Sequence, residues 1–388
     1  MENQTNIPSL RFSEFNGKWE AKKISEVLSI GSGKDYKHLS FGNVPVYGTG
    51  GLMTTVDSYL HDGETVCIGR KGTIDKPFYY FGKLWTVDTL FYTHSFIDSN
   101  PKFIFNLFQR INWKEYNEAS GVPSLSKSTI EKIKLELPSL KEQIKIASFL
   151  TKVDEKLTAL KKKKELLEQY KKGVMQQIFS QELRFKNDDG NDFPEWEEKS
   201  LGEIGETYNG LTGKSKDDFG HGKPYIQYKQ IFDDSKIDIS RFENVVITDK
   251  DKQNRVLFGD AFFTVSSETP NEIGMSSVLL DNIEELYLNS FCFGFRPNSF
   301  DILDPYYSRY LFRSELFRNE IVKLAQGSTR FNMSKVQLMK IVVNLPTKKE
   351  QIQISKFLST IDNKISFCQS QIEKAEIWKK GLLQQMFC

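Results

Sequence analysis

Two stretches of the chain carry the apolar pattern of long amphipathic helices. In residues 139–179, apolar side chains recur alternately four and three positions apart, as in a helix that packs lengthwise against another helix. The same pattern returns in residues 347–387. The apolar face of each helix cannot stay exposed to water. We therefore expect the two helices to pack on each other, antiparallel. The expected packing positions are Ile146, Leu150, Val153, Leu157, Leu160, Leu167, Val174, Ile178, Ile354, Leu358, Ile361, Ile365, Ile372, Leu382 and Met386.

The two helical stretches are copies of one another. Leu137-Pro138 returns as Leu345-Pro346, a shift of 208 residues (345 − 137), and the same shift relates residues 171–179 to residues 379–387. One added residue would rotate a helix face by about 100°, so an unchanged spacing indicates that the helix length matters. A duplicated helix of fixed length is typical of a device that holds two similar modules at a set distance.

The start of each copy carries a capping pattern. Ser139 follows the first Leu-Pro and Thr347 follows the second. Glu142 and Glu350 come three residues after these hydroxyl residues, which is the spacing of a capping box. We therefore expect these glutamates, and the glutamine after each, to support the helix starts rather than to contact a ligand.

A segment with short apolar runs, punctuated by Gly and Asp, precedes each helix and predicts strands. Asn100-Pro101 and Asp304-Pro305 at matching places predict helix starts. The fold class is therefore mixed α+β, with two similar globular modules, two long antiparallel coiled-coil helices and an internal pseudo-twofold repeat. The expected domain bounds are 1–138, 139–182, 183–346 and 347–388. The expected strands lie at 44–47, 65–68, 78–81, 85–87, 225–228, 261–265 and 286–288.

Composition narrows the class of protein. A chain of 388 residues is too long for one ordinary core, and 39% apolar residues suffice to bury two. The net charge of +2 means that any nucleic-acid contact must come from local basic patches. The four cysteines have no paired spacing, and no apolar run has membrane length, so we expect a cytoplasmic protein with no membrane contact.

The sequence shows no complete motif for catalysis, phosphate binding or metal binding. Gly213-Lys214-Ser215 lacks the glycine that a phosphate-binding loop needs five residues before Gly213. The four histidines are scattered and pair with no cysteine or carboxylate at metal-ligand spacing. We therefore expect no catalytic residues, no metal and no cofactor in this chain, and the interpretation as an enzyme is disfavoured.

The whole pattern resembles the specificity subunit of Type I restriction-modification systems. The resemblance covers nearly the whole chain and rests on the order module–helix–module–helix and on a signature at each helix start, which occurs twice. Phe149-Leu150 and Phe357-Leu358, with Asp154 and Asp362, match the family as well. The signature residues are Leu137, Pro138, Glu142, Gln143 and Ile146, then Leu345, Pro346, Glu350, Gln351 and Ile354.

The resemblance implies a non-catalytic reader of DNA. Each module would be a target recognition domain for one half of a bipartite asymmetric site in double-stranded DNA, and the helices would be the spacer. Two methyltransferase subunits would use S-adenosylmethionine to methylate adenine, and two restriction subunits would use ATP and Mg²⁺. Catalysis would then belong to these partners.

Candidate DNA contacts are polar residues in glycine-rich turns and at strand ends. Lysine and arginine neutralise phosphates, and hydrogen-bonding side chains read bases. These positions are Lys34, Tyr36, Lys37, Arg70, Lys71 and Thr73 in the first module, and Lys214, Lys216, Lys229, Ser266 and Ser267 in the second.

Two other classes of function stay open. The chain could be a stand-alone DNA methyltransferase or nuclease with disguised motifs. It could also be a coiled-coil scaffold that binds only protein.

Overall fold

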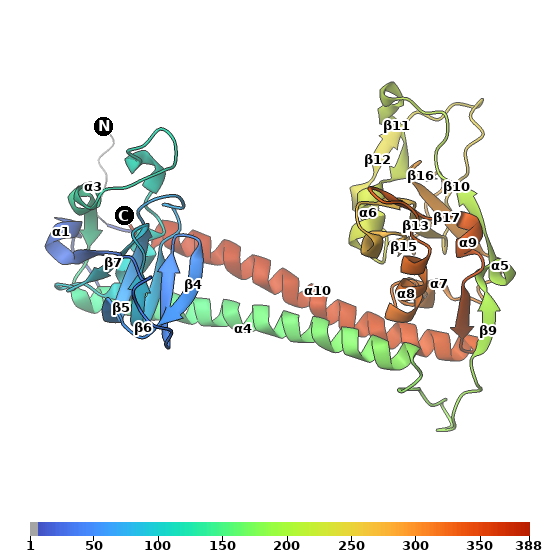
Figure 1. The fold of residues 1–388 in the computed structure, drawn as a ribbon, viewed down its shortest axis with the longest axis horizontal. Coiled ribbons are helices and arrows are strands. Elements are labelled where there is room, and N and C mark those ends of the chain that lie inside the picture. The colour runs from blue at the N-terminus through green and yellow to red at the C-terminus, as the bar shows by residue number, and fades with distance from the viewer. Residues whose placement is uncertain (1–6) are drawn as a thin grey trace. The chain divides into compact units, whose positions relative to one another are not determined.

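The chain forms two compact units, each built from one globular module and parts of two long helices. A computed structural model describes residues 7–388, and Figure 1 labels its elements. The first unit comprises the residues up to 163 together with 368–388, and the second comprises 164–367. Helices α4 (Leu140–Phe179) and α10 (Lys348–Gln385) each contribute to both units. Both long helices predicted from the apolar pattern are present.

The first module contains a mixed sheet and a two-stranded ribbon that leads into α4. The sheet has six strands in the order β2-β7-β5-β6-β3-β4, antiparallel except for the pair β3 and β6. The ribbon pairs β1 with β8. The bounds are β1 (Glu20–Lys23), α1 (Ile24–Val27), β2 (Ser29–Ser32), β3 (Val44–Gly48), β4 (Gly51–Val56), β5 (His61–Gly69), β6 (Phe78–Thr86), β7 (Leu90–His94), α2 (Pro101–Phe108), η1 (Trp113–Tyr116), α3 (Lys127–Lys132) and β8 (Lys134–Leu137).

The second module is built from smaller sheets. Their strand orders are β10-β17-β13-β15, β12-β11-β16, β14-β18 and β19-β9. The bounds are β9 (Glu197–Ser200), α5 (Leu201–Ile204), β10 (Gly205–Asn209), η2 (Lys216–Asp218), β11 (Phe219–Ile226), α6 (Tyr228–Asp233), η3 (Ile239–Arg241), β12 (Glu243–Val245), β13 (Ala261–Thr264), β14 (Ser266–Ser267), η4 (Pro270–Glu272), β15 (Ser276–Val278), β16 (Tyr287–Leu288), β17 (Cys292–Pro297), α7 (Pro305–Leu311), α8 (Glu315–Lys323), β18 (Phe331–Asn332), α9 (Lys335–Leu338) and β19 (Val342–Leu345).

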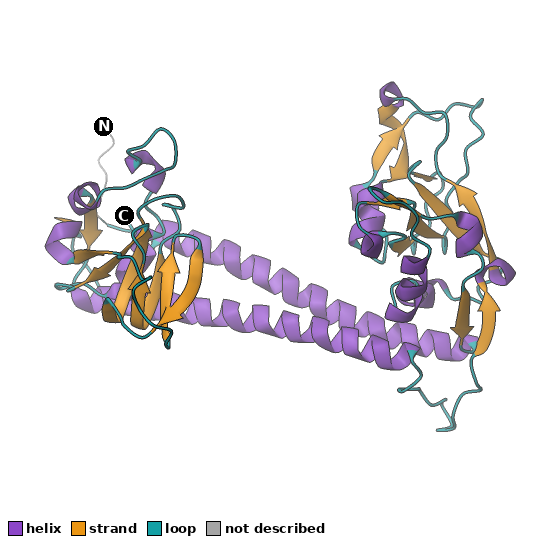
Figure 2. Cartoon of the chain, viewed as in Figure 1, coloured by secondary structure: helices purple, strands orange, loops and turns teal. Residues whose placement is uncertain are grey.

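The two modules share a framework. In each, the first strand pairs antiparallel with the strand that runs into the long helix, as β1 with β8 and as β9 with β19. Each also contains one parallel pair, β3 with β6 and β11 with β16. Asn100 and Asp304 cap α2 and α7, each with proline in the first turn, as their sequences predict. The expected mixed α+β fold with an internal repeat is confirmed (Figure 2).

Two strand predictions need correction. Residues 78–81 and 85–87 were expected as separate runs, but 78–86 form the single strand β6. Gly82, with φ of 117°, lies inside that strand opposite Gly63 of β5, so the glycine does not end it. The run 225–228 is divided, because β11 ends at Ile226 and α6 begins at Tyr228.

In the first unit, segments of α4 and α10 pack on each other and on the module. Asp154 of α4 pairs with Lys379 of α10, and Lys161 pairs with Glu376, each at 2.6 Å. A forward step along α4 thus matches a backward step along α10, so these segments are antiparallel. Leu160 packs against the edge of this core. One buried apolar cluster includes Ile146, Leu150, Val153, Leu157, Ile372, Leu382 and Met386.

The second unit repeats this arrangement with the remaining helix segments. Its core joins both helices to the module, and Ile365 packs against it. Leu167 is half-buried. The other expected packing positions, Val174, Ile178, Ile354, Leu358 and Ile361, are buried in this cluster.

A buried glutamine at the start of each long helix ties the helix to its module. Gln143 Oε1 accepts from the backbone N–H of Asn100 at 2.9 Å, and Nε2 donates to the carbonyls of Asp98 and Pro138 at 3.1 and 2.9 Å. Gln351 makes the same three hydrogen bonds in the second unit, at 2.8, 2.8 and 2.9 Å. The expectation that these glutamines support the helix starts is confirmed.

The capping-box expectation is wrong. Glu142, 2% exposed, accepts two hydrogen bonds from Arg11 at 2.7 Å. Glu350, 0% exposed, accepts from Arg184 at 3.3 and 3.0 Å. Burial forces a charged carboxylate to find a charged partner, which a backbone N–H does not supply. Ser139 Oγ alone contributes a long cap contact, 3.4 Å from the N–H of Glu142.

Within residues 7–388, no helix combines the length and apolar character that crossing a bilayer requires.

Candidate nucleic-acid interface

One turn in the first module gathers the polar surface that the sequence singles out. The turn between β6 and β7 is held from two sides. Lys34 N–H donates to the carbonyl of Thr86 at 2.8 Å, and Arg70 N–H donates to the carbonyl of Thr89 at 2.8 Å. A Cβ on Gly33 would lie only 1.9 Å from the backbone of this turn, so glycine permits the close approach. The turn therefore brings the two predicted segments, 34–37 and 70–73, to one surface.

The six candidates of the first module differ in their surroundings. Lys34, Lys37, Arg70 and Lys71 are exposed, whereas Tyr36 and Thr73 are half-buried. Arg70 Nη1 donates to the carbonyl of Asp88 at 3.2 Å. Among the described residues, the ammonium groups of the three lysines have no ion-pair partner. Their contact with DNA stays a prediction.

The second module repeats the turn between β16 and β17. Leu211 N–H donates to the carbonyl of Leu288 at 2.7 Å, and Val265 N–H donates to the carbonyl of Phe291 at 3.1 Å. A Cβ on Gly210 would lie 2.0 Å from the turn backbone, as for Gly33 in the first module. Both modules thus present the same backbone scaffold at this surface.

Two of the three lysine candidates of the second module form ion pairs within that module. Lys214 Nζ lies 2.7 Å from Asp251, and its side chain is 7% exposed. Its hydrogen bond lowers the pKa of Asp251 to about 2. Lys229 pairs with Asp233 one helical turn away at 3.1 Å, while Lys216 is exposed.

The two serine candidates line one wall of a small cavity. Ser266 accepts at its carbonyl from the hydroxyl of Tyr228 at 2.7 Å, and Ser267 Oγ donates to the carbonyl of Thr269 at 2.6 Å. Phe291, 67% exposed, stands at the same place. The cavity has a volume of 390 Å³ and is lined by Tyr228, Ser266, Ser267, Glu268, Glu272, Phe291 and Arg330.

Residues 118–126 form a loop beside this surface in the first module, and no sequence pattern had singled it out. Lys71 and Ser124 form an antiparallel bridge, and Leu125 N–H donates to the carbonyl of Arg70 at 2.9 Å. The base of the loop is closed by a hydrogen bond from Glu118 N–H to the carbonyl of Ser124 at 3.0 Å. The loop therefore belongs to the same surface as the predicted residues 70–73.

The second module contains the matching loop, residues 326–334. Ser266 pairs with Asn332, and Met333 N–H donates to the carbonyl of Val265 at 3.0 Å. Gln326 N–H closes its base on the carbonyl of Asn332 at 3.1 Å. The shift between the loops is again 208 residues (333 − 125). The recurrence of Ser126-Lys127 as Ser334-Lys335 was the available sequence signal.

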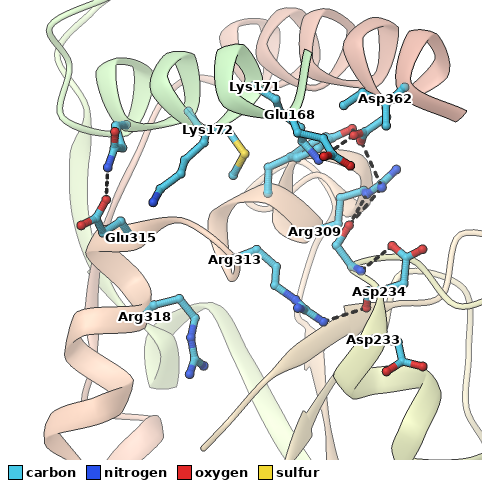
Figure 3. Close-up of a pocket in the computed structure, with 15 residues that line it drawn as sticks. Glu168, Lys171, Lys172, Asp233, Asp234, Arg309, Arg313, Glu315, Arg318 and Asp362 are labelled. Atoms are coloured by element: carbon cyan, nitrogen blue, oxygen red, sulfur yellow. Dashed lines mark hydrogen bonds and ion pairs between the residues drawn. The ribbon is translucent and has the colours of Figure 1, made fainter. Parts of the chain in front are cut away.

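Two largely buried arginines hold the walls of the 390 Å³ cavity. Arg313 donates to three carbonyls at the end of α6, at 2.7 to 3.1 Å, and Figure 3 shows its bond to Asp234. Arg318 donates to three carbonyls of the loop 271–274, at 2.6 to 3.0 Å. Burial lowers the pKa of both guanidinium groups to about 10. These bonds fix α6, which carries Tyr228, and the segment 271–274, which contains Glu272.

A larger cavity of 560 Å³ lies within the second unit, where α4 and α10 meet α7 (Figure 3). Asp362 accepts there from Lys171 at 2.5 Å, from Arg309 at 3.2 Å and from the hydroxyl of Tyr310 at 2.7 Å. Gln176 of α4 bonds to Glu315 of α8. Most of these charged groups are engaged with one another, so the cluster fastens the module to the helices.

Comparison with known proteins gives the same family twice along the chain. Residues 16–169 and 194–376 match the family model described as the Type I restriction modification DNA specificity domain. The chain is 27% identical over 293 residues to the Type I restriction enzyme MjaVIII specificity subunit of Methanocaldococcus jannaschii, covering 70% of this chain and 65% of that protein. It is 27% identical over 162 residues to the Type I restriction enzyme EcoprrI specificity subunit of Escherichia coli, covering 37% of this chain and 38% of that protein.

The aligned segments thus span less than two thirds of either relative. A solved structure shows the same fold. It is the crystal structure of the Type-I restriction-modification system S subunit from M. genitalium. The two share 15% identity and a TM-score of 0.62, over 98% of this chain and 99% of that one.

Proposed function

We propose, because this chain belongs to the Type I restriction modification DNA specificity family, that it reads a bipartite asymmetric DNA site with one half-site per module. One observation carries the proposal. The two modules share the backbone scaffold of one surface yet present different side chains on it. The bridge at its centre joins Lys71 to Ser124 in the first module and Ser266 to Asn332 in the second. Two modules with the same backbone scaffold and different surface side chains suit two different half-sites.

The exposed lysines among the candidates suit the phosphate backbone of DNA. Lys34, Lys37, Lys71 and Lys216 are exposed. Lysines that neutralise phosphates supply affinity without sequence information, whereas polar groups at base edges supply specificity. We assign these four lysines to affinity. Lys214 contributes less, because Asp251 already occupies its ammonium group.

The long helices supply the spacing between the half-sites in this proposal. Helix α4 has 40 residues and would be about 60 Å long at 1.5 Å per residue. Its copy α10 keeps the same register, with the shared shift of 208 residues (345 − 137). Two weak half-site contacts on one stiff connector reinforce each other by effective concentration. The spacer length then becomes part of the recognised sequence.

Partner subunits would carry out catalysis. The name of the relatives, specificity subunit of a Type I restriction enzyme, supports other subunits as partners, and the description of the matching family model supports DNA. We propose two methyltransferase subunits, which use S-adenosylmethionine, and two restriction subunits, which use ATP and Mg²⁺.

A duplicated aromatic surface suits two copies of one partner. The ring of Phe12 contacts Phe149 in the first unit, and Phe185 contacts Phe357 in the second, with centroids 5.8 and 5.5 Å apart. In the first unit the exposed Trp378 also contacts Phe149, with ring centroids 6.0 Å apart. We propose these two surfaces as the docking sites for the two methyltransferase copies.

Mapping methylated adenines in cells with and without the gene tests the function. We expect a two-part motif that disappears when the gene is deleted. Exchanging residues 1–138 for the module of another family member should change one half of the motif. The matched exchange of residues 183–346 should change the other half. An unchanged motif after both exchanges would refute the proposal.

The alternative classes give different results. A stand-alone methyltransferase or nuclease would turn over DNA when the purified chain is given S-adenosylmethionine and Mg²⁺ without partners. A protein-only scaffold would leave the assembled complex without sequence-selective binding. We expect no turnover by the chain alone, and binding by the complex that weakens as salt rises.

A further inference from the structure

The tips of the two matching loops carry different side chains at one equivalent position. The shift of 208 residues places Arg330 of the second loop where the first loop has Val122 (330 − 122). Both are exposed, Val122 to 59%. Neither is explained by packing, and both stand beside the surface on which the modules differ.

The Arg330 guanidinium is free for a ligand. No ion-pair or hydrogen-bond partner for it lies among the described residues. Its backbone, in contrast, belongs to a loop held at its base, where Gln326 and Asn332 exchange two backbone hydrogen bonds. Gly327 has φ of 129°, and a Cβ there would lie 2.1 Å from the carbonyl oxygen of Arg330. A free charged group on a held backbone is the arrangement that recognition requires.

The cavity beside Arg330 favours a base edge over a phosphate. Glu268 and Glu272 line it together with Arg330. Their carboxylates would repel a phosphate but can accept a hydrogen bond from the N4 amino group of cytosine. Arginine binds guanine through two parallel bonds to O6 and N7. The exposed ring of Phe291 adds an apolar wall at the same place.

We propose that this cavity is the base-reading site of the second module, in which Arg330 selects the guanine of one G·C pair in the second half-site. Glu268 accepts from the cytosine of the same pair. This assignment rests on the proposed function and deepens it. The cavity is prepared before DNA arrives, because Arg313 and Arg318 hold two of its walls.

The test measures binding by the complex of this chain with its methyltransferase partner. The probes are duplexes in which each base pair of the second half-site is changed in turn. The wild type should prefer G·C at one position by about 5- to 150-fold, the range for one bidentate arginine–guanine pair. Arg330→Ala should lose the preference at that position alone. Arg330→Lys should lose part of it, because a flexible ammonium group lacks the rigid planar fork with which arginine fits guanine O6 and N7.

Val122→Ala is the matched control, and it should keep every preference in the second half-site. Unchanged preference at all positions in Arg330→Ala would overturn the assignment. An equal loss of binding affinity for every duplex, together with a weaker dependence of affinity on salt, would also overturn it. That result would mark Arg330 as a phosphate contact. If the wild-type complex itself shows no sequence preference, the proposed function fails together with the assignment. If the wild type discriminates and Arg330→Ala discriminates equally, only the assignment fails.

Discussion

Lys379 Nζ lies 2.6 Å from a carboxylate oxygen of Asp154, and the same pair recurs with the helices exchanged. In the second unit the lysine is Lys171 of α4 and the carboxylate is Asp362 of α10, at 2.5 Å. Both residues shift by 208 positions (379 − 171 and 362 − 154). Lys171 and Lys379 are thus each one half of an ion pair between the two helices.

The two repeated pairs should differ in strength. Asp362, whose side chain is 20% exposed, also binds Arg309 and Tyr310, whereas Asp154 is 39% exposed. Asp362→Asn should lower the free energy of unfolding by about 1 to 3 kcal/mol. Asp154→Asn should lower it by about 0.2 to 1 kcal/mol, as for a solvated pair. Urea unfolding of both variants measures this, and equal losses would contradict it.

The ion pair between Arg184 and Glu350 at the second helix start should stabilise the fold only when both residues are present. Arg184→Met leaves Glu350, which is 0% exposed, without its charged partner. We expect a loss of about 3 to 5 kcal/mol in the free energy of unfolding. The double variant Arg184→Met/Glu350→Gln should recover part of it, because no charge is left buried. A double variant as unstable as the single one would exclude this explanation.

The backbone of the second loop should matter for specificity. Gly327→Ala would place a Cβ 2.1 Å from the carbonyl oxygen of Arg330 and displace the loop tip. We expect relaxed selectivity in the second half-site, measured on the same set of changed duplexes. Gly121→Ala in the first loop is the control, because a Cβ there meets nothing within 4 Å. Relaxation by both variants would point to a general loss of folding.

The Lys214–Asp251 pair predicts a pH-dependent contribution to stability. The hydrogen bond from Lys214 lowers the pKa of Asp251 from 3.8 to about 2 in the folded chain. A depressed carboxyl pKa stabilises the fold above the unfolded value, and the effect is lost as pH falls through the folded value. Melting temperatures should therefore fall more steeply for the wild type than for Asp251→Asn between pH 4 and pH 2. Parallel curves would show that the pair does not form.

The polar residues at the helix starts show which contacts the local sequence can predict and which it cannot. Gln143 and Gln351 were expected to support the helix starts, and they do so through bonds to distant backbone groups. Glu142 and Glu350 were expected to cap the helices but bind Arg11 and Arg184 instead. A capping box uses contacts three residues apart, whereas these arginines lie far away in the chain. Periodicity carries no information about such partners.

The candidate residues for DNA contact divide in the same way. A glycine-rich turn and a strand end directed attention to Lys34 and Arg70, which the structure brings to one turn. Their contact with DNA stays a prediction. The loop residues Val122 and Arg330 were missed, although the shift of 208 residues (330 − 122) extends to them. Their surroundings lack apolar periodicity, and only strand pairing with residues 71 and 266 places them on the surface.

The sequence by itself determined the two long helices, their fixed length and the internal repeat. Such features follow from spacing along the chain, because helix geometry converts residue number directly into direction and length. The tertiary structure decided which charged groups are buried in pairs, which lysines already have partners and which loops share a surface. Those facts depend on segments far apart in the chain coming together, and no local pattern encodes their meeting.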